Sequence, residues 1–155
     1  MLSVLIAPSD IKVGLLSSEK EECFAELIEL IVARHPEIKR EEALQSLIER
    51  DEKMSTAILP HIAVPHAVCE NLKSTAVSIG ISRFGIEFES DNPDVEIENP
   101  INIIFEILSN KDDIENVVKI MRDILQISSN PDFFTQILNA NSSNEVYNLI
   151  YNLES

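Results

Sequence analysis

Glycine is scarce in this chain: Gly14, Gly80 and Gly85 are the only three among 155 residues. The phosphate-binding loops of P-loop enzymes and of dinucleotide-binding folds need several closely spaced glycines, because the backbone must approach the phosphates. No such run is present, so both kinds of nucleotide site are excluded. A Gly-x-Ser-x-Gly elbow is also absent, which argues against a serine hydrolase of that type.

Cysteine is rarer still, with Cys23 and Cys69 far apart and without Cys-x-x-Cys spacing. This usage predicts neither a disulfide framework nor a zinc site, and a reducing cytoplasm is the expected location. His61 and His66 are five residues apart in a segment interrupted by proline, not four apart on a helix. That spacing argues weakly against a metal site, and none is predicted.

Long apolar runs are missing as well. No stretch approaches the roughly 18 apolar residues that a helix needs to span a bilayer. The apolar N-terminal stretch has no basic region and is interrupted by Pro8, Ser9 and Asp10, so it does not read as a signal peptide. We expect a soluble protein without stable membrane insertion.

Basic and aromatic residues are few. Twelve Lys and Arg stand against 27 Asp and Glu, for a net charge of −15, so binding to nucleic acid or to an anionic membrane is not expected. Hydrophobic residues make up 45% of the chain, too many for a disordered acidic tail. Aromatic residues make up 5%, without tryptophan, so the core should be aliphatic. Most carboxylates are expected to serve solubility; attraction of a basic partner is the alternative.

Hydrophobic periodicity predicts an α/β fold. Helices are expected over residues 18–34, 40–50, 112–128, 131–138 and 143–153, with capping serines at Ser18 and Ser143. Strands are expected over residues 11–16, 75–81, 86–88 and 101–108, and residues 90–100 should form a loop. Helices then cover both faces of a mixed β-sheet in a single-domain sandwich over residues 1–155. The strand order does not follow from the pattern.

The segment from Ser55 to His66 (STAILPHIAVPH) is the candidate site. It carries two of the three histidines and is expected to be a connecting segment, where a scaffold can present reactive groups. A neutral imidazole has a free lone pair that can attack phosphorus. Arg50 delivers a guanidinium to this segment, which suits phosphate oxygens, and the hydroxyls of Ser55 and Thr56 can donate to them.

Residue types alone favour the simpler interpretation that His66 is an ordinary polar residue on a loop. His61 is expected to be structural or exposed to solvent, with a place in the same cleft as the alternative. A stronger indication comes from the wider motif around these residues.

The motif resembles the active-site segment of fructose/mannitol-type enzyme IIA domains of the bacterial phosphotransferase system, a family that includes the nitrogen-regulatory enzyme IIA. The family form is an Arg-Glu pair, a Ser-Thr pair and then I-A-I/V-P-H, which Arg50, Ser55, Thr56 and residues 62–66 match. Weaker matches occur at Leu5 to Ile11, Ile101 to Phe105 and Ser143 to Ile150.

The resemblance implies a concrete function. A histidine phosphocarrier protein would phosphorylate His66, which would pass the phosphoryl group to a IIB domain for sugar uptake. Alternatively, phosphorylation would act as a regulatory signal, and the chain would be a binding module whose docking depends on the state of His66. The resemblance also implies a mixed sheet flanked by helices and no metal or organic cofactor.

Three departures from the family pattern stand out. Leu59 and His61 replace glycines, so the loop should be stiffer or differently shaped, and Asp51 replaces the usual glutamate after the arginine. Asn116 is aligned with a second active-site histidine of many members. An amide can donate a hydrogen bond but cannot exchange a proton near neutral pH, which predicts less efficient onward transfer. A paralogue that kept the fold and lost the chemistry is a third possibility.

Overall fold

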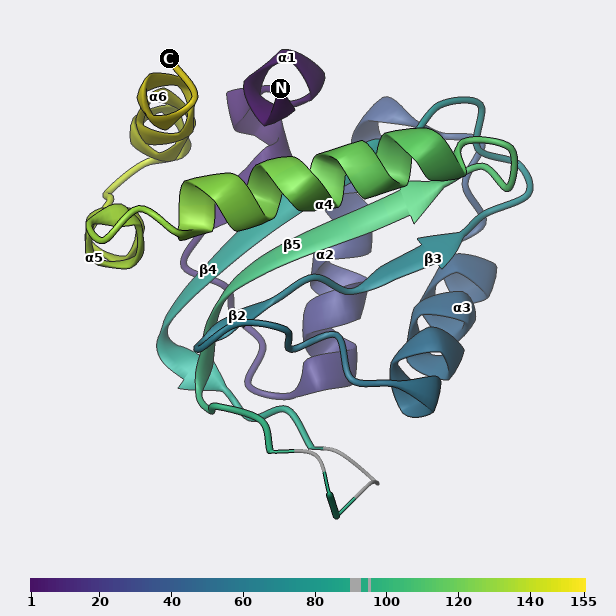
Figure 1. The fold of residues 1–155 in the computed structure, drawn as a ribbon. Coiled ribbons are helices and arrows are strands. Elements are labelled where there is room, and N and C mark those ends of the chain that lie inside the picture. Colours follow the sequence, from purple (N-terminus) through teal and green to yellow (C-terminus); the bar gives the residue numbers. More distant parts are fainter. Residues whose placement is uncertain (90–92, 95) are drawn as a thin grey trace.

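A mixed β-sheet with helices on both faces forms the fold (Figure 1). The computed structural model describes residues 1–89, 93, 94 and 96–155. The described strands are β1 (Ile11–Val13), β2 (Ile62–Ala63), β3 (His66–Val68), β4 (Ala76–Ile86) and β5 (Ile101–Ser109). The described helices are α1 (Leu2–Leu5), α2 (Lys20–Arg34), α3 (Arg40–Lys53), α4 (Ile114–Ser128), α5 (Phe133–Leu138) and α6 (Ser143–Leu153), with a short 3₁₀ helix, η1 (Pro8–Asp10).

The strand β5 organises the sheet. It runs antiparallel to β4 along one edge and parallel to both β2 and β3 along the other, and β1 adds to β4 in parallel. All nine residues of β5 are buried, as its β-branched sequence predicts for a strand covered on both faces. The structure confirms the mixed sheet and supplies the strand order.

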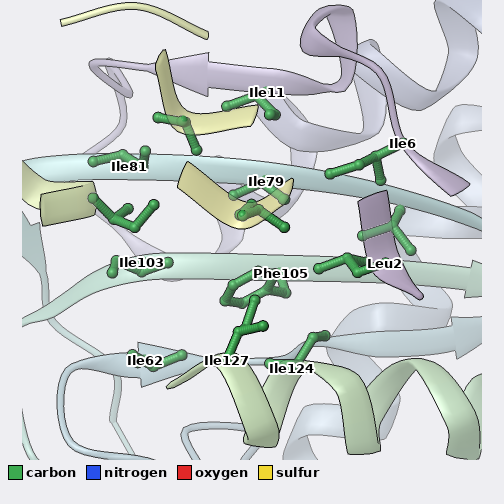
Figure 2. Close-up of a cluster of buried hydrophobic side chains, with 14 of the residues drawn as sticks. Leu2, Ile6, Ile11, Ile62, Ile79, Ile81, Ile103, Phe105, Ile124 and Ile127 are labelled. Carbon is green, nitrogen blue, oxygen red and sulfur yellow. The ribbon is translucent and has the colours of Figure 1, made fainter. Parts of the chain in front are cut away.

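Two aliphatic layers fill the space between sheet and helices. On one face, Ile79, Ile103 and Phe105 of the sheet pack against Leu2 and Ile124 of the helices (Figure 2). On the other face, α2 and α3 cover a second cluster of buried residues, which includes Phe24, Leu27, Leu47, Ile104 and Leu108. Isoleucine, leucine and valine dominate both layers, so the expected aliphatic core is confirmed.

The strand beside β5 is interrupted between β2 and β3. Pro65 lies in this gap and has no N–H to donate, while its carbonyl accepts a bond from Ile107 N–H at 2.9 Å. His66 is the first residue of β3. The expectation that Ser55 to His66 is only a connecting segment is therefore wrong, because the segment contains β2 and ends at a strand.

The helix starts in the structure differ from those expected from the sequence. The capping box at Ser18 is wrong, because α2 begins at Lys20 after Glu19 without a side-chain cap. Ser142, not Ser143, caps α6 by accepting a bond from Glu145 N–H at 3.2 Å. Ser143 instead donates its hydroxyl to the Ile11 carbonyl.

The strand ends also differ from expectation. The strand expected to end at residue 81 continues as β4 to Ile86, through a register irregularity after Ile81. No separate strand forms over residues 86–88. In the expected loop over residues 90–100, residues 90–92 and 95 lie outside the described part, and the rest have no helix or strand.

Candidate functional site

His66 lies at the edge of the sheet, where β3 pairs with β5. It is in register with Ile107, and aligned residues of parallel strands point to the same face. Ile107 belongs to the hydrophobic layer under α4, so His66 shares that face. The His66 side chain is half-buried, so the imidazole is held by the sheet while part of it remains accessible.

One hydrogen bond orients the imidazole. Nδ1 of His66 lies 2.9 Å from the carbonyl oxygen of Val64. A carbonyl can only accept, so Nδ1 carries the hydrogen and donates it. In the neutral ring the other nitrogen, Nε2, then keeps its lone pair. The geometry therefore defines which nitrogen can act as a nucleophile.

The protonation state of His66 is also shifted. Burial lowers the pKa of His66 below its ordinary value of 6.5, and the positive charge of Arg50 lowers it further, although the bond to Val64 opposes both effects. A lowered pKa increases the fraction of neutral, nucleophilic imidazole at neutral pH. Burial and the charge of Arg50 thus both favour the neutral imidazole, which is the form that can attack phosphorus.

Arg50 lies in the last turn of α3 and acts on His66 through its charge. Its Nη1 donates to the Met54 carbonyl at 2.9 Å, which holds the half-buried side chain across the helix end. A guanidinium has five N–H donors, so this contact leaves most of them for an anion. The structure places Arg50 where its charge acts on the His66 imidazole, and its role in binding phosphate stays a prediction.

The two hydroxyl residues have different environments. Thr56 is 1% exposed, and its hydroxyl is already donated to Oδ1 of Asp51 at 2.9 Å. Contact between that hydroxyl hydrogen and a phosphate would require this bond to break. Ser55 is half-buried, and its oxygen accepts a bond from Ala57 N–H at 3.2 Å. That bond leaves the Ser55 O–H free to donate to an anion.

The structure places His61 in a turn before β2, away from His66, and its alternative place in the same cleft stays a prediction. It follows Pro60 in a tight turn that Leu59 and Ile62 close, with φ of 63°. Its ring contacts the Pro100 carbonyl at 2.9 Å and packs on Phe134. Ile62, which follows His61, pairs with Ile103, and His66 pairs with Ile107; these positions are four residues apart on β5, which corresponds to about 13 Å along a strand.

This turn also explains one departure from the family pattern. A left-handed residue after proline is the type II arrangement, which normally uses glycine. His61 adopts the backbone conformation of the missing glycine, and the bonds to its ring and to its carbonyl hold it there. The turn keeps a glycine-like conformation although no glycine is present.

Asn116 lies in the first turn of α4. Its amide nitrogen donates to Oδ2 of Asp113 at 3.3 Å, and Asp113 also accepts the hydroxyl of Thr75. Within the described part of the chain no hydrogen bond joins Asn116 to His66. The effect of Asn116 on onward transfer stays a prediction.

Two residues of this region were not predicted as parts of the site. Asp51 is buried in the last turn of α3, where it accepts bonds from Thr56 and pairs with Lys20 of α2 at 2.7 Å. A carboxylate near a helix C-terminus opposes the helix dipole. This unfavourable position is a signal in the sequence that Asp51 needs other partners.

Among residues 1–89, 93, 94 and 96–155, no group of histidine, cysteine, aspartate and glutamate side chains could hold a metal ion. Within the same residues no helix is both long enough and apolar enough to cross a membrane.

Comparison with solved structures identifies proteins of the same fold. The nitrogen regulatory protein IIA-Ntr from Neisseria meningitidis superposes with a TM-score of 0.82 at 19% identity, over 96% of this chain and 98% of that one. The enzyme IIA-mannitol in a complex with phosphorylated enzyme IIB from Escherichia coli superposes with a TM-score of 0.75 at 18% identity, over 95% and 97%.

Sequence comparison agrees with the structural one. The fructose-specific EIIABC component of Bacillus subtilis (strain 168) is 22% identical over 149 residues. The match covers 96% of this chain but only 23% of that protein, so this chain spans about a quarter of the relative. A model of the phosphoenolpyruvate-dependent sugar phosphotransferase system EIIA 2 family matches residues 5–153. The chain therefore belongs to the EIIA 2 family of this phosphotransferase system.

Proposed function

We propose that this chain is a phosphoryl carrier in which Nε2 of His66 accepts a phosphoryl group from a histidine phosphocarrier protein. The observation that carries the proposal is the bond between Nδ1 of His66 and the Val64 carbonyl, which leaves Nε2 as the free nucleophile. The Nε2 lone pair forms the new N–P bond as the donor's N–P bond breaks, and the donor imidazole takes the electron pair.

The site can stabilise two charges of the proposed transition state, the negative charge on the phosphoryl oxygens and the positive charge on the His66 ring. Arg50 and the Ser55 hydroxyl would donate to the phosphoryl oxygens, which carry the negative charge. The His66 ring gains positive charge as Nε2 bonds to phosphorus, and the Val64 carbonyl stabilises it through Nδ1–H. We assign Thr56 to holding the segment in place, because its hydroxyl is bound to Asp51.

A labelling experiment tests this proposal. Incubation with radiolabelled phosphoenolpyruvate and the general phosphotransferase proteins should label the wild type, whereas His66→Gln should stay unlabelled. Circular dichroism would check that the variant is folded, and NMR of the labelled protein should place phosphorus on Nε2. Equal labelling of wild type and His66→Gln would refute the assignment.

The proposed next acceptor is a IIB domain. One structural neighbour is enzyme IIA-mannitol bound to phosphorylated enzyme IIB, which supports this partner for a chain of the same fold. Met54 and Ile58, which precede His66, and Val68, which follows it, are exposed apolar side chains, and such side chains favour protein contacts. We expect residues 1–155 to act as one enzyme IIA unit in the cytoplasm.

A regulatory module is the second proposed function. Here the phosphorylation state of His66 would control docking on a target protein, and the exposed apolar residues beside His66 would serve this contact equally well. Pull-downs with wild type and His66→Asp distinguish the two functions. A partner whose capture changes with the added charge would favour regulation. Charge-independent capture together with phosphoryl transfer to a IIB domain would favour transport.

A further inference from the structure

We propose that Asp51 is a positioning residue for phosphoryl transfer, which orients His66 through a continuous chain of hydrogen bonds. The inference rests on the proposed function of His66, but its structural part can be tested in the unphosphorylated protein. The chain of bonds runs from Lys20 through Asp51, Thr56 and Val64 to the imidazole.

The first part of this chain is buried between two helices. Asp51 Oδ2 pairs with Nζ of Lys20 at 2.7 Å, and Oδ1 accepts both the N–H and the hydroxyl of Thr56, at 3.1 and 2.9 Å. Lys20 is itself held, because it also donates to the Glu89 carbonyl at 3.3 Å and lies over the Phe88 ring. The carboxylate thus fixes Thr56 from two directions.

The second part leads from Thr56 to the nucleophile. The Thr56 carbonyl accepts a bond from Val64 N–H at 2.8 Å, and the Val64 carbonyl accepts the bond from Nδ1 of His66 at 2.9 Å. Each donor–acceptor distance is that of an ordinary strong hydrogen bond. Only two residues, Thr56 and Val64, separate the Asp51 carboxylate from the ring.

The position of Val64 decides the state of His66. Its carbonyl keeps the hydrogen on Nδ1 and the lone pair on Nε2. The sheet holds this residue from one side, through the pairing of Ile62 and Ala63 with β5. Thr56 holds it from the other side, and Asp51 holds Thr56. Loss of the carboxylate would leave the buried N–H and hydroxyl of Thr56 unsatisfied, and the Val64 carbonyl would lose its fixed position.

A merely structural role is the competing explanation, because Asp51 also joins α2 to α3. Asp10 provides a matched control. It is also buried, pairs with Arg34 and accepts a bond from Ala7 N–H at 2.8 Å. It precedes β1, on the opposite edge of the sheet from β3. Asp10→Asn should therefore lower stability as Asp51→Asn does, without acting on His66.

The experiment compares Asp51→Asn, Thr56→Val, Thr56→Ser and Asp10→Asn with the wild type. Heteronuclear NMR of the unphosphorylated proteins reports which ring nitrogen of His66 carries the hydrogen. Labelling kinetics separate kcat from the KM for the phosphocarrier protein. Thr56→Val retains the backbone N–H bond to Asp51 and removes only the hydroxyl, so it carries the test if Asp51→Asn fails to fold.

We expect wild type, Thr56→Ser and Asp10→Asn to hold the hydrogen on Nδ1. Asp51→Asn and Thr56→Val should populate both ring forms and lose kcat by up to roughly 100-fold with KM little changed, as for a small misplacement of a reacting group. Normal ring state and kcat in Asp51→Asn and Thr56→Val would overturn the proposal. A wild type that is never labelled would refute the carrier function, and the NMR comparison would still decide the role of Asp51.

Discussion

Glu106→Gln should stabilise the protein at about pH 8 while leaving its stability at about pH 4.5 almost unchanged. Glu106 lies in the middle of β5 and is fully buried. Neither carboxylate oxygen has a hydrogen-bond partner within the described part of the chain. The charge of Glu106 raises the pKa of the Cys23 thiol of α2 and of the Cys69 thiol after β3, and Ser78 of β4 is its paired residue in the sheet; none of these three groups carries positive charge.

The sign of the effect follows from the burial. Burial raises the pKa of Glu106 well above 4.5, so the folded state binds this proton more tightly than the unfolded state. The stability contributed by the bound proton is fully present below the unfolded pKa and is lost as pH rises toward the folded pKa. Between the unfolded and the folded pKa, the free energy of unfolding falls by up to about 1.4 kcal/mol per pH unit. Glutamine stays neutral, so it removes this loss.

Urea unfolding of both proteins between about pH 4.5 and pH 8 measures the difference. Glu70→Gln is the matched control, because it removes one negative charge from an exposed position. The free energy of unfolding of Glu70→Gln should differ little from that of the wild type, and this difference should not increase as the pH rises. If the free energies of unfolding of the wild type and Glu106→Gln change with pH in the same way over this range, the fold does not hold Glu106 neutral.

Arg50→Gln should slow the phosphorylation of His66 by roughly 100-fold, which is the typical effect of losing one donor to a charged transition state. Arg50→Lys should fall between this variant and the wild type, because an ammonium cannot make a bidentate contact with phosphate. The free energy of unfolding should change by only about 1 kcal/mol in either case, since among the residues that the structure describes Arg50 makes one hydrogen bond, to the Met54 carbonyl.

Rapid-quench labelling measures this rate, and NMR titration of the His66 ring gives a second readout. The charge of Arg50 lowers the pKa of His66, so the pKa should rise in Arg50→Gln. Arg40→Lys is the control on the same helix, because Arg40 is exposed and pairs with Glu29. An unchanged labelling rate in Arg50→Gln would remove Arg50 from the proposed site.

The sequence predicted the fold class because the local patterns are strong. The β-branched run of β5 and the spaced apolar residues of α2, α3 and α4 each indicate one structure. The strand order depends on contacts between distant segments, which periodicity does not contain. The cap of the last helix was misplaced because Ser142 and Ser143 are equally good caps by residue type, and only the hydrogen bond of Ser143 to the Ile11 carbonyl separates them.

Some residues of the candidate site could be proposed from the sequence and others could not, for a physical reason. His66 and Arg50 could be proposed as site residues because their side chains carry the chemistry and match a motif. Lys20 could not be found, since its contact with Asp51 depends on how the start of α2 meets the end of α3. The position of His61 was also hidden, although Pro60 before it allowed a turn with a left-handed second residue.

The gap in the sheet edge at Pro65 has a chemical consequence. In a strand at the edge of a sheet, only alternate carbonyls face the neighbouring strand, and Pro65 contributes one of them by accepting the bond from Ile107 N–H. Pro65 has no N–H to donate, and the oxygen of the residue before it accepts a bond from an imidazole. A backbone carbonyl at the sheet edge thus provides the acceptor that a neighbouring acidic side chain could otherwise supply, without adding negative charge next to an incoming phosphate.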